Sequence, residues 1–225
     1  AADISTIAGD TSGTVTVSGN MNITGTAAAI TTAVGDVDSF SGTPTAALSN
    51  AHNITQLITI NDAIDGTLTL ADYTVALSGT SAQVAAALDG TFASTYTGAA
   101  TVSNAHTLAQ LKTINNGTTG TITLNDVTVA LEGSAADIKA ALAGTFAASY
   151  TGNVTINDAN GTGIAAADIS TIAGATSGTV TVSNNINITG TAAQIETAVG
   201  DVNTFSGTPT ATLSNAHTTA QLATI

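Results

Sequence analysis

The sequence predicts an α/β repeat solenoid, built from coils of about 27 residues that pair into units of about 54 residues. Three observations predict this fold class. The chain repeats itself at several lengths, helix-capping signals recur at a fixed spacing, and short runs alternate threonine with branched apolar residues. A single coil of this length cannot bury its apolar side alone, so the coils must stack on one another.

The longest repeat joins the two ends of the sequence. Residues 3–60 return as residues 168–225, with 46 of 58 positions identical. A shorter repeat is marked by the tetrapeptide SNAH, which begins at Ser49, Ser103 and Ser214, and by a variant, NDAN, which begins at Asn157. Taken in chain order, the first two intervals between these starting positions are equal and the third is three residues longer. Residues are therefore inserted near 159–163, where a longer turn is the simplest interpretation.

These steps define the expected domain organisation. We expect one continuous array that is a fragment of a longer chain. Its units would be residues 1–48, 49–102, 103–156 and 157–213, with a partial unit at 214–225. Each coil would run in the order cap, short helix, turn and strand.

Helix starts are marked by small polar residues at a constant spacing, at Thr26, Asn53, Thr80, Thr107 and Ser134, and again at Thr191 and Thr218. A Gln or Asp stands three positions after several of them, in the pairs Thr107–Gln110, Ser134–Asp137, Thr191–Gln194 and Thr218–Gln221. This spacing is typical of the capping box, in which two side chains satisfy each other's backbone N–H groups. Apolar residues then follow at helical spacing, which predicts one inward face.

Strands are predicted where threonine alternates with Val, Leu or Ile, at residues 14–17, 67–70, 121–124 and 179–182, and later in the coil at 101–102 and 153–156. Threonine would face outward and the apolar residue inward. We expect strands of successive coils to pair in parallel, about 4.8 Å apart. Because a helix is ~10 Å wide, one helix per strand step would require either strong curvature or helices that alternate between two sides of the stack. The difference between odd and even coils favours the alternating arrangement.

A competing interpretation gives tandem small α+β modules. Here Ala71-Asp72, Asn125-Asp126 and Ser183-Asn184 would be hairpin turns. Disorder is disfavoured, because 43% hydrophobic residues placed in regular register can bury enough surface to oppose chain entropy.

Composition excludes some partners. Lys112 and Lys139 are the only basic residues against fifteen acidic ones, a formal charge of −13. Nucleic-acid binding needs basic side chains that replace counterions, and anionic membrane surfaces attract the same residues. No apolar run is long enough to span a bilayer. With no cysteine, stability must come from packing and backbone hydrogen bonds, and the acidic balance favours an extracellular location.

Two motifs carry a family resemblance. The run Ala173-Gly-Ala-Thr-Ser-Gly-Thr-Val180, followed by Ile188-Thr-Gly-Thr-Ala-Ala-Gln-Ile195, resembles the SwmB-like tandem repeats of large cyanobacterial cell-surface proteins. By repetition the resemblance covers the whole chain. It implies a secreted, cell-surface and non-catalytic role, and it transfers no functional residue.

Histidine offers the first candidate chemistry. His52, His106 and His217 are the only histidines, and each closes an SNAH motif. Their repetition suggests a metal site, but copies two coils apart would lie about 9.6 Å from each other, too far to share an ion that needs nitrogen ligands at ~2.0–2.1 Å. A Ser-His-Asp triad needs one unique geometry, whereas this histidine environment is copied. We therefore expect structural histidines.

Acidic runs offer weak oxygen ligands for Ca²⁺, at residues 35–38, 61–66 and 157–161. None matches the twelve-residue calcium loop that ends in glutamate, so turn-forming Asx residues are the preferred interpretation. Phenylalanine falls once per two coils, at Phe40, Phe92, Phe146 and Phe205, with Tyr96 and Tyr150 four positions after two of them, which predicts an aromatic ladder in the core. Six N-x-[ST] sequons offer glycosylation sites, at Asn22, Asn53, Asn116, Asn153, Asn160 and Asn187.

We therefore expect no catalytic residue, no cofactor-binding residue and no metal ligand. The expected function is that of a non-catalytic structural module of an extracellular fibre, filament or cell-surface layer, which associates with itself or with neighbouring repeats. The alternative is an adhesive module that recognises a glycan or a neighbouring cell.

Overall fold

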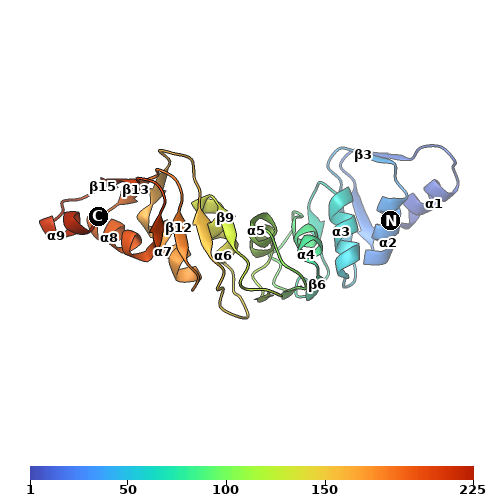
Figure 1. Cartoon of the computed structure of the whole chain (residues 1–225). Helices are drawn as coiled ribbons and strands as arrows, with labels where there is room; N and C mark the ends of the chain where they lie inside the picture. The colour runs from blue at the N-terminus through green and yellow to red at the C-terminus, as the bar shows by residue number, and fades with distance from the viewer. The chain divides into compact units, whose positions relative to one another are not determined.

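The chain folds into short helices and short parallel strands that alternate along the sequence, in a computed structural model that describes residues 1–225 (Figure 1). The nine helices are α1 (Ala2–Gly9), α2 (Ala27–Gly35), α3 (Ile54–Ala63), α4 (Ser81–Leu88), α5 (Leu108–Gly117), α6 (Ala135–Leu142), α7 (Ala166–Ala175), α8 (Ala192–Asp201) and α9 (Thr219–Thr224). From α2 to α6 the helix starts recur at one constant spacing, which confirms the expected coil length over that range.

The strands form five small sheets. In order along each sheet they are β1 (Thr16–Ser18) and β3 (Ser39–Ser41); β2 (Asn22–Gly25), β4 (Thr45–Leu48) and β5 (Leu68–Thr69); β6 (Leu77–Gly79), β7 (Ala100–Val102) and β8 (Ile122–Thr123); β14 (Thr204–Phe205), β12 (Val180–Val182), β10 (Val154–Ile156) and β9 (Leu131–Gly133); and β11 (Gly163–Ala165), β13 (Asn187–Gly190) and β15 (Thr210–Leu213).

Every strand pair is parallel, and each joins a strand to one about a coil further along the sequence, as where Thr16 stands opposite Ser39. The expected parallel pairing of strands about one coil length apart is therefore confirmed, and a continuous solenoid is compatible with it. Hairpins need antiparallel neighbours, so the α+β modules with hairpin turns do not form. Asp72 and Asp126 instead close local turns, in which each carboxylate accepts the backbone N–H two positions on, from Thr74 and Thr128.

Helix capping agrees with the sequence at each expected start. Thr107 and Gln110 bond each other reciprocally, as do the pairs Thr191–Gln194 and Thr218–Gln221. Ser134 is the exception. Its hydroxyl accepts the Asp137 N–H and then donates to the Asp137 carboxylate, which also binds the Lys112 ammonium. The second half of that capping box is thus replaced by an ion pair.

The six expected strands are present; five are shorter than the alternating runs that predicted them, and β7 begins one residue before its run. Most of their inward residues are buried, and Leu68 and Ile122 fully so, whereas Val15 and Leu124 are only half-buried. Nine further strands were not predicted, among them β2 and β13, because strands this short give too brief a pattern to recognise.

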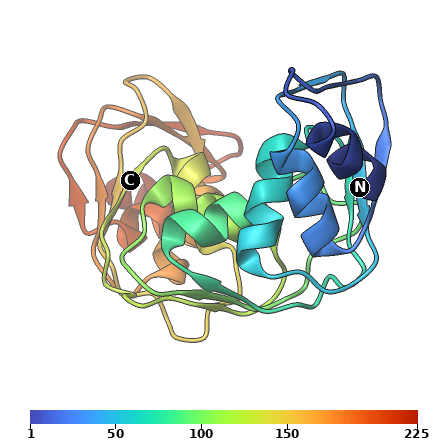
Figure 2. The ribbon, with the colours of Figure 1, turned by 90° about the vertical axis from the view of Figure 1, so that its right-hand side faces the viewer.

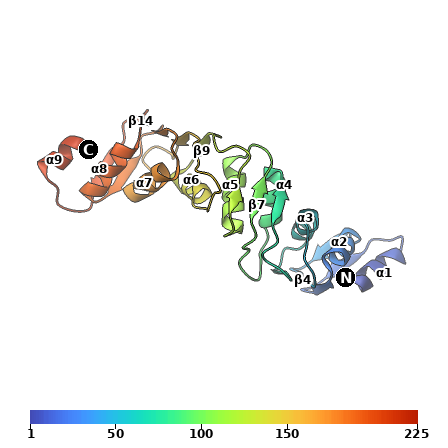
Figure 3. The same ribbon diagram turned by 90° about the horizontal axis from the view of Figure 1, so that it is seen from below.

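The sequence predicted helices that alternate between two sides, and this prediction is wrong within each unit. Within one unit, successive helices pack against each other, α1 on α2, α2 on α3 and α3 on α4, and likewise α6 on α7 and α7 on α8. Figure 2 shows the three N-terminal helices lying side by side, and Figure 3 shows α7 next to α8. Helices are wider than a strand step, and no sheet continues beyond two to four strands.

The inserted residues near 159–163 form a turn at Asn160–Gly161 and the start of β11, which leads into α7. A longer turn was expected there, but helix α7 was not. It has no capping side chain, because Ala165 occupies its N-cap position, so the signal that marks the other helices is missing. The equivalent helix α1 lacks a side-chain cap for the same reason.

The chain divides into two compact units. Unit 1 comprises residues 1–104 and 116–123, and unit 2 comprises residues 105–115 and 124–225. Each has its own apolar core of Ala, Val, Ile and Leu, with one large aromatic residue, Tyr96 in unit 1 and Tyr150 in unit 2. Phe40, Phe92, Phe146 and Phe205 are only half-buried, so the expected aromatic ladder is filled by tyrosine more than by phenylalanine.

Candidate functional site

The most site-like feature is a buried contact between a histidine and a tyrosine, which occurs once in each unit. In unit 1, the Nε2 atom of His52 lies 3.0 Å from the hydroxyl oxygen of Tyr96. In unit 2, His106 and Tyr150 make the same contact at 3.0 Å. We refer to these contacts as the His–Tyr pairs. Both partners come from loops: the histidine closes SNAH just before a helix, and the tyrosine follows a helix of a later coil.

The hydrogen-bond partners decide the tautomer of each histidine. The Tyr96 hydroxyl donates to the carbonyl of Val75 at 2.6 Å, and the Tyr150 hydroxyl donates to that of Val129 at 2.6 Å. Because the phenolic hydrogen is committed there, Nε2 of the histidine must donate to the phenolic oxygen. The other ring nitrogen, Nδ1, then carries a lone pair, and in both pairs it is buried without a hydrogen-bond partner.

A nearby glycine allows this loop to approach its neighbour. A Cβ atom on Gly98 would lie 2.0 Å from the Val75 carbonyl oxygen, and one on Gly152 would lie 2.0 Å from that of Val129. No side chain fits such a space. The sequence Y-T-G, at Tyr96 and at Tyr150, therefore combines the hydrogen-bonding residue with the close contact that brings it into place.

Burial keeps these histidines neutral. Burial lowers the pKa of His52 and of His106, and the negative charges of Asp72 and Asp126 oppose this only in part. Burial also raises the pKa of Tyr96 and of Tyr150, with Asp72 and Asp126 acting in the same direction. The paired groups therefore stay uncharged around neutral pH.

This arrangement does not resemble a catalytic triad. In a triad the histidine holds a nucleophile with one nitrogen and a carboxylate with the other. Here one nitrogen binds a tyrosine whose proton is held by a backbone carbonyl, and the second has no partner. His217, the third copy, is exposed. The structure does not group three His, Cys, Asp or Glu side chains in a way that would hold a metal ion.

In two of the three acidic runs, a carboxylate accepts a hydrogen bond from the backbone of another coil. Asp38 accepts the N–H of Val15 at 2.7 Å, and Asp158 accepts the N–H of Ala135 at 2.7 Å. Both bonds join one coil to the next. Of the sequon residues, Asn53 caps α3 and Asn22 accepts a hydrogen bond from Thr45.

Sequence reasoning missed the role of the second residue of SNAH. Its side-chain oxygen caps the helix of the preceding coil, at the first helical N–H, in four copies: Asn50 to Ala27, Asn104 to Ser81, Asp158 to Ala135 and Asn215 to Ala192, at 2.7 to 2.8 Å. The separation along the sequence is 23 each time. Asp replaces Asn in NDAN because only the acceptor oxygen is used. The constant separation between Asn and the helix start was the signal that could have revealed it.

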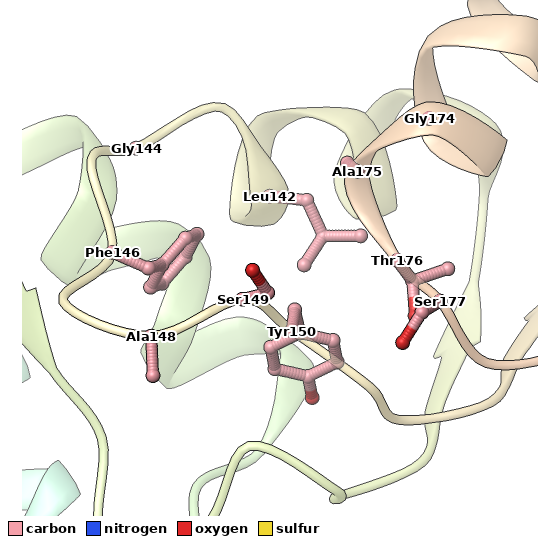
Figure 4. A pocket seen from close by; sticks show the side chains of 10 residues that line it. All are labelled: Leu142, Gly144, Phe146, Ala148, Ser149, Tyr150, Gly174, Ala175, Thr176 and Ser177. Atoms are coloured by element: carbon pink, nitrogen blue, oxygen red, sulfur yellow. The ribbon is translucent and has the colours of Figure 1, made fainter.

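Unit 2 also has a surface hollow of about 410 Å³ beside the second His–Tyr pair. Figure 4 shows its lining, with the rings of Phe146 and Tyr150 below Leu142 and with hydroxyl groups from Ser149, Thr176 and Ser177. The Thr176 hydroxyl donates to the Gly152 carbonyl and accepts the Gly178 N–H. Tyrosine is the only ionisable residue of the lining, and its proton is already bonded.

Comparison with protein-family models, curated proteins and solved structures gives no match. None of the helices is long and apolar enough to cross a membrane.

Proposed function

We propose that this chain is a structural repeat module, a solenoid of stacked coils that belongs to an extracellular fibre, filament or cell-surface layer and that does no catalysis. One observation carries the proposal. Polar side chains that recur in the sequence join one coil to another, and equivalent residues make the same bonds in both units.

Three sets of bonds support this. The Asn or Asp of SNAH caps the preceding helix in four copies. The His–Tyr pairs join loops 44 residues apart in both units. Asn61 and Asn115 donate their side-chain amides to carbonyl groups near the C-terminal ends of the next helices, α4 and α6. Coils held by nearest-neighbour contacts of this kind give a stiff element whose length grows with the number of repeats.

Location at the cell surface rests on the acidic balance of the chain and on its resemblance to the repeats of cyanobacterial surface proteins. Immunogold electron microscopy of the cells that produce the chain tests this directly. An antibody raised against residues 1–225 should label surface layers or filaments, and a control antibody against a cytosolic enzyme should not. Label confined to the cell interior would contradict the proposal.

The alternative, an adhesive module, draws on the hollow of Figure 4. Phe146 is half-buried there beside serine hydroxyls, so an apolar ring and hydrogen-bonding groups face the same space. Glycan-array binding that is lost in Phe146→Ala, and kept in a control variant with Phe205→Ala, would favour this function over a purely structural one.

A further inference from the structure

The loop of residues 49–53, which we call the SNAH loop, connects three coils of unit 1 through neighbouring side chains. Asn50 accepts the N–H of Ala27 at the start of α2, and Asn53 caps the start of α3. Between them, His52 bonds the tyrosine that lies in the loop after α4. The SNAH loop therefore ties the coils of α2, α3 and α4 together.

The histidine is the residue that holds this loop against the core. His52 is 5% exposed, whereas the other four residues of the SNAH loop are exposed. No apolar side chain of the loop would be uncovered if the histidine left its place. Release of this one side chain would therefore free the loop while the buried residues of the neighbouring helices and strands keep their contacts.

His52 fits this place only while it is neutral. Its Nε2–H is used by the phenolic oxygen of Tyr96, whose own proton is held by the Val75 carbonyl. Its Nδ1 atom is buried and has no hydrogen-bond partner. A proton added to Nδ1 would create a charge and an N–H donor that neither water nor an acceptor reaches, which is unfavourable on both counts.

One carboxylate opposes this effect without removing it. The titratable groups that face His52 are Tyr96 and, from the turn before β6, Asp72. The charge of Asp72 attracts an imidazolium, but its carboxylate is held by the N–H and the hydroxyl of Thr74 and does not bond Nδ1. Burial outweighs this attraction, so the pKa of His52 is lowered. Once the loop opens, water hydrates the ring and its pKa returns to about 6.5.

Unit 2 repeats the arrangement. His106 is 4% exposed and stands between the exposed residues Ala105 and Thr107. Its Nδ1 atom is also buried without a partner, and Tyr150 and Asp126 are the titratable groups that face it. The same geometry therefore occurs twice, in two separate cores.

We propose that each His–Tyr pair is an acid-released clamp, which opens locally when its histidine takes up a second proton and which frees the histidine loop while the helices and strands stay folded. In unit 1 the opening also removes Asn50 from the start of α2. Coils that are firmly joined at neutral pH would then move more freely in acid. This property would regulate the structural function proposed above, on which its biological role rests, but the opening itself depends only on the geometry of the pair.

Hydrogen exchange at the N–H of Ala27 tests the clamp, because the acceptor of this group is Asn50 in the SNAH loop. The open loop binds a proton below pH ~6.5 and the closed loop does not, so the open population rises about tenfold for each further pH unit. The protection of the Ala27 N–H, relative to an unstructured chain, should therefore fall about tenfold between pH 7.5 and 5.5.

Urea separates a local opening from unfolding of the whole unit. Concentrations below the unfolding transition should leave the exchange of Ala27 unchanged, because a local opening exposes little surface. The N–H of Leu77, bonded to the Ala99 carbonyl between β6 and β7, is the reference for larger openings. If Ala27 and Leu77 respond equally to pH and to urea, the opening is not local and the proposal is wrong.

Two histidine variants assign the effect to its residue. His52→Gln keeps a neutral N–H donor for the tyrosine and cannot titrate, so the protection of Ala27 should be the same at pH 7.5 and 5.5. His217→Gln removes an exposed histidine and should keep the tenfold fall. Constant protection in the unaltered chain, or an undiminished fall in His52→Gln, would overturn the proposal.

Circular dichroism checks that both variants fold. If His52→Gln does not, the ring of His52 in the unaltered chain decides by nuclear magnetic resonance: protonation with the ordinary pKa of about 6.5, while the Ala27 N–H stays protected, would also overturn the proposal. None of these results bears on the surface location, which the microscopy above decides independently.

Discussion

The hydroxyl of Tyr150 is the atom whose removal tests the role of the His–Tyr pairs most simply. Tyr150→Phe keeps the ring in the core and removes only the oxygen that joins His106 to the Val129 carbonyl. The buried Nε2–H of His106 then has no acceptor, which costs about 1–3 kcal/mol. Loss of the bond to the half-buried carbonyl adds about 1 kcal/mol. We expect the free energy of unfolding to fall by about 2–4 kcal/mol.

Urea unfolding followed by far-ultraviolet circular dichroism at pH 7.5 measures this change. Tyr96→Phe should give a similar loss, because the pair in unit 1 has the same geometry. Tyr73→Phe is the matched control. Its hydroxyl only accepts the N–H of Leu70 from a half-buried position, so about 1 kcal/mol or less is expected.

A double-mutant cycle completes the test. With His106→Leu as the second change, the coupling between His106 and Tyr150 should be about 0.5–3 kcal/mol. If Tyr150→Phe costs no more than Tyr73→Phe, or if the coupling is zero, the pairs do not join the coils and the reasoning behind them fails.

Three further outcomes are expected. Burial lowers the pKa of each histidine in the His–Tyr pairs. Below the ordinary histidine pKa of about 6.5, the unfolded chain therefore binds more protons than the folded chain, and stability should fall as the pH drops from 7.5 to 5. A urea midpoint that stays constant over this range would contradict the burial of the histidines. Gly152→Ala should destabilise the chain strongly, since the added Cβ would meet a carbonyl oxygen at 2.0 Å. Gly174→Ala lies within α7, where the added Cβ would have no atom within 4 Å, and it should stabilise the chain by about 0.5–1 kcal/mol. The thermal unfolding temperatures of the two variants should shift in opposite directions. Leu57→Ala removes a fully buried side chain and should lower the free energy of unfolding by about 2–5 kcal/mol. Leu222→Ala, at the duplicate but half-exposed position, should lower it much less. Equal losses in urea unfolding would argue against the difference in burial between the two copies.

Local signals predicted the elements of this fold well, because each has a physical cause within a few residues. A threonine cap with glutamine three positions later starts a helix at Thr191 as expected. The runs at Leu68 and Ile122 place apolar side chains in the core at period two. Helices α1 and α7 escaped because alanine, which cannot cap, stands at their N-cap positions.

The relations between coils were harder to predict, because they depend on residues far apart in the sequence. The helices stack on neighbours instead of alternating, which no local pattern encodes. The histidines were expected to be structural, yet their tyrosine partners 44 residues away were not identified. The capping of Ala27 by Asn50 was missed in the same way, although its separation of 23 recurs through the sequence.

The central claim is that successive coils stack as a repeat array held by nearest-neighbour contacts, and inserting one more unit tests it most directly. A second copy of residues 103–156, placed between Ile156 and Asn157, adds one full unit in register. If the account is correct, the extended chain keeps its circular dichroism per residue, and the denaturant dependence of its unfolding free energy increases with the added buried surface. An inserted unit that stays unfolded, with no change in that dependence and rapid proteolysis of the added residues, would contradict it.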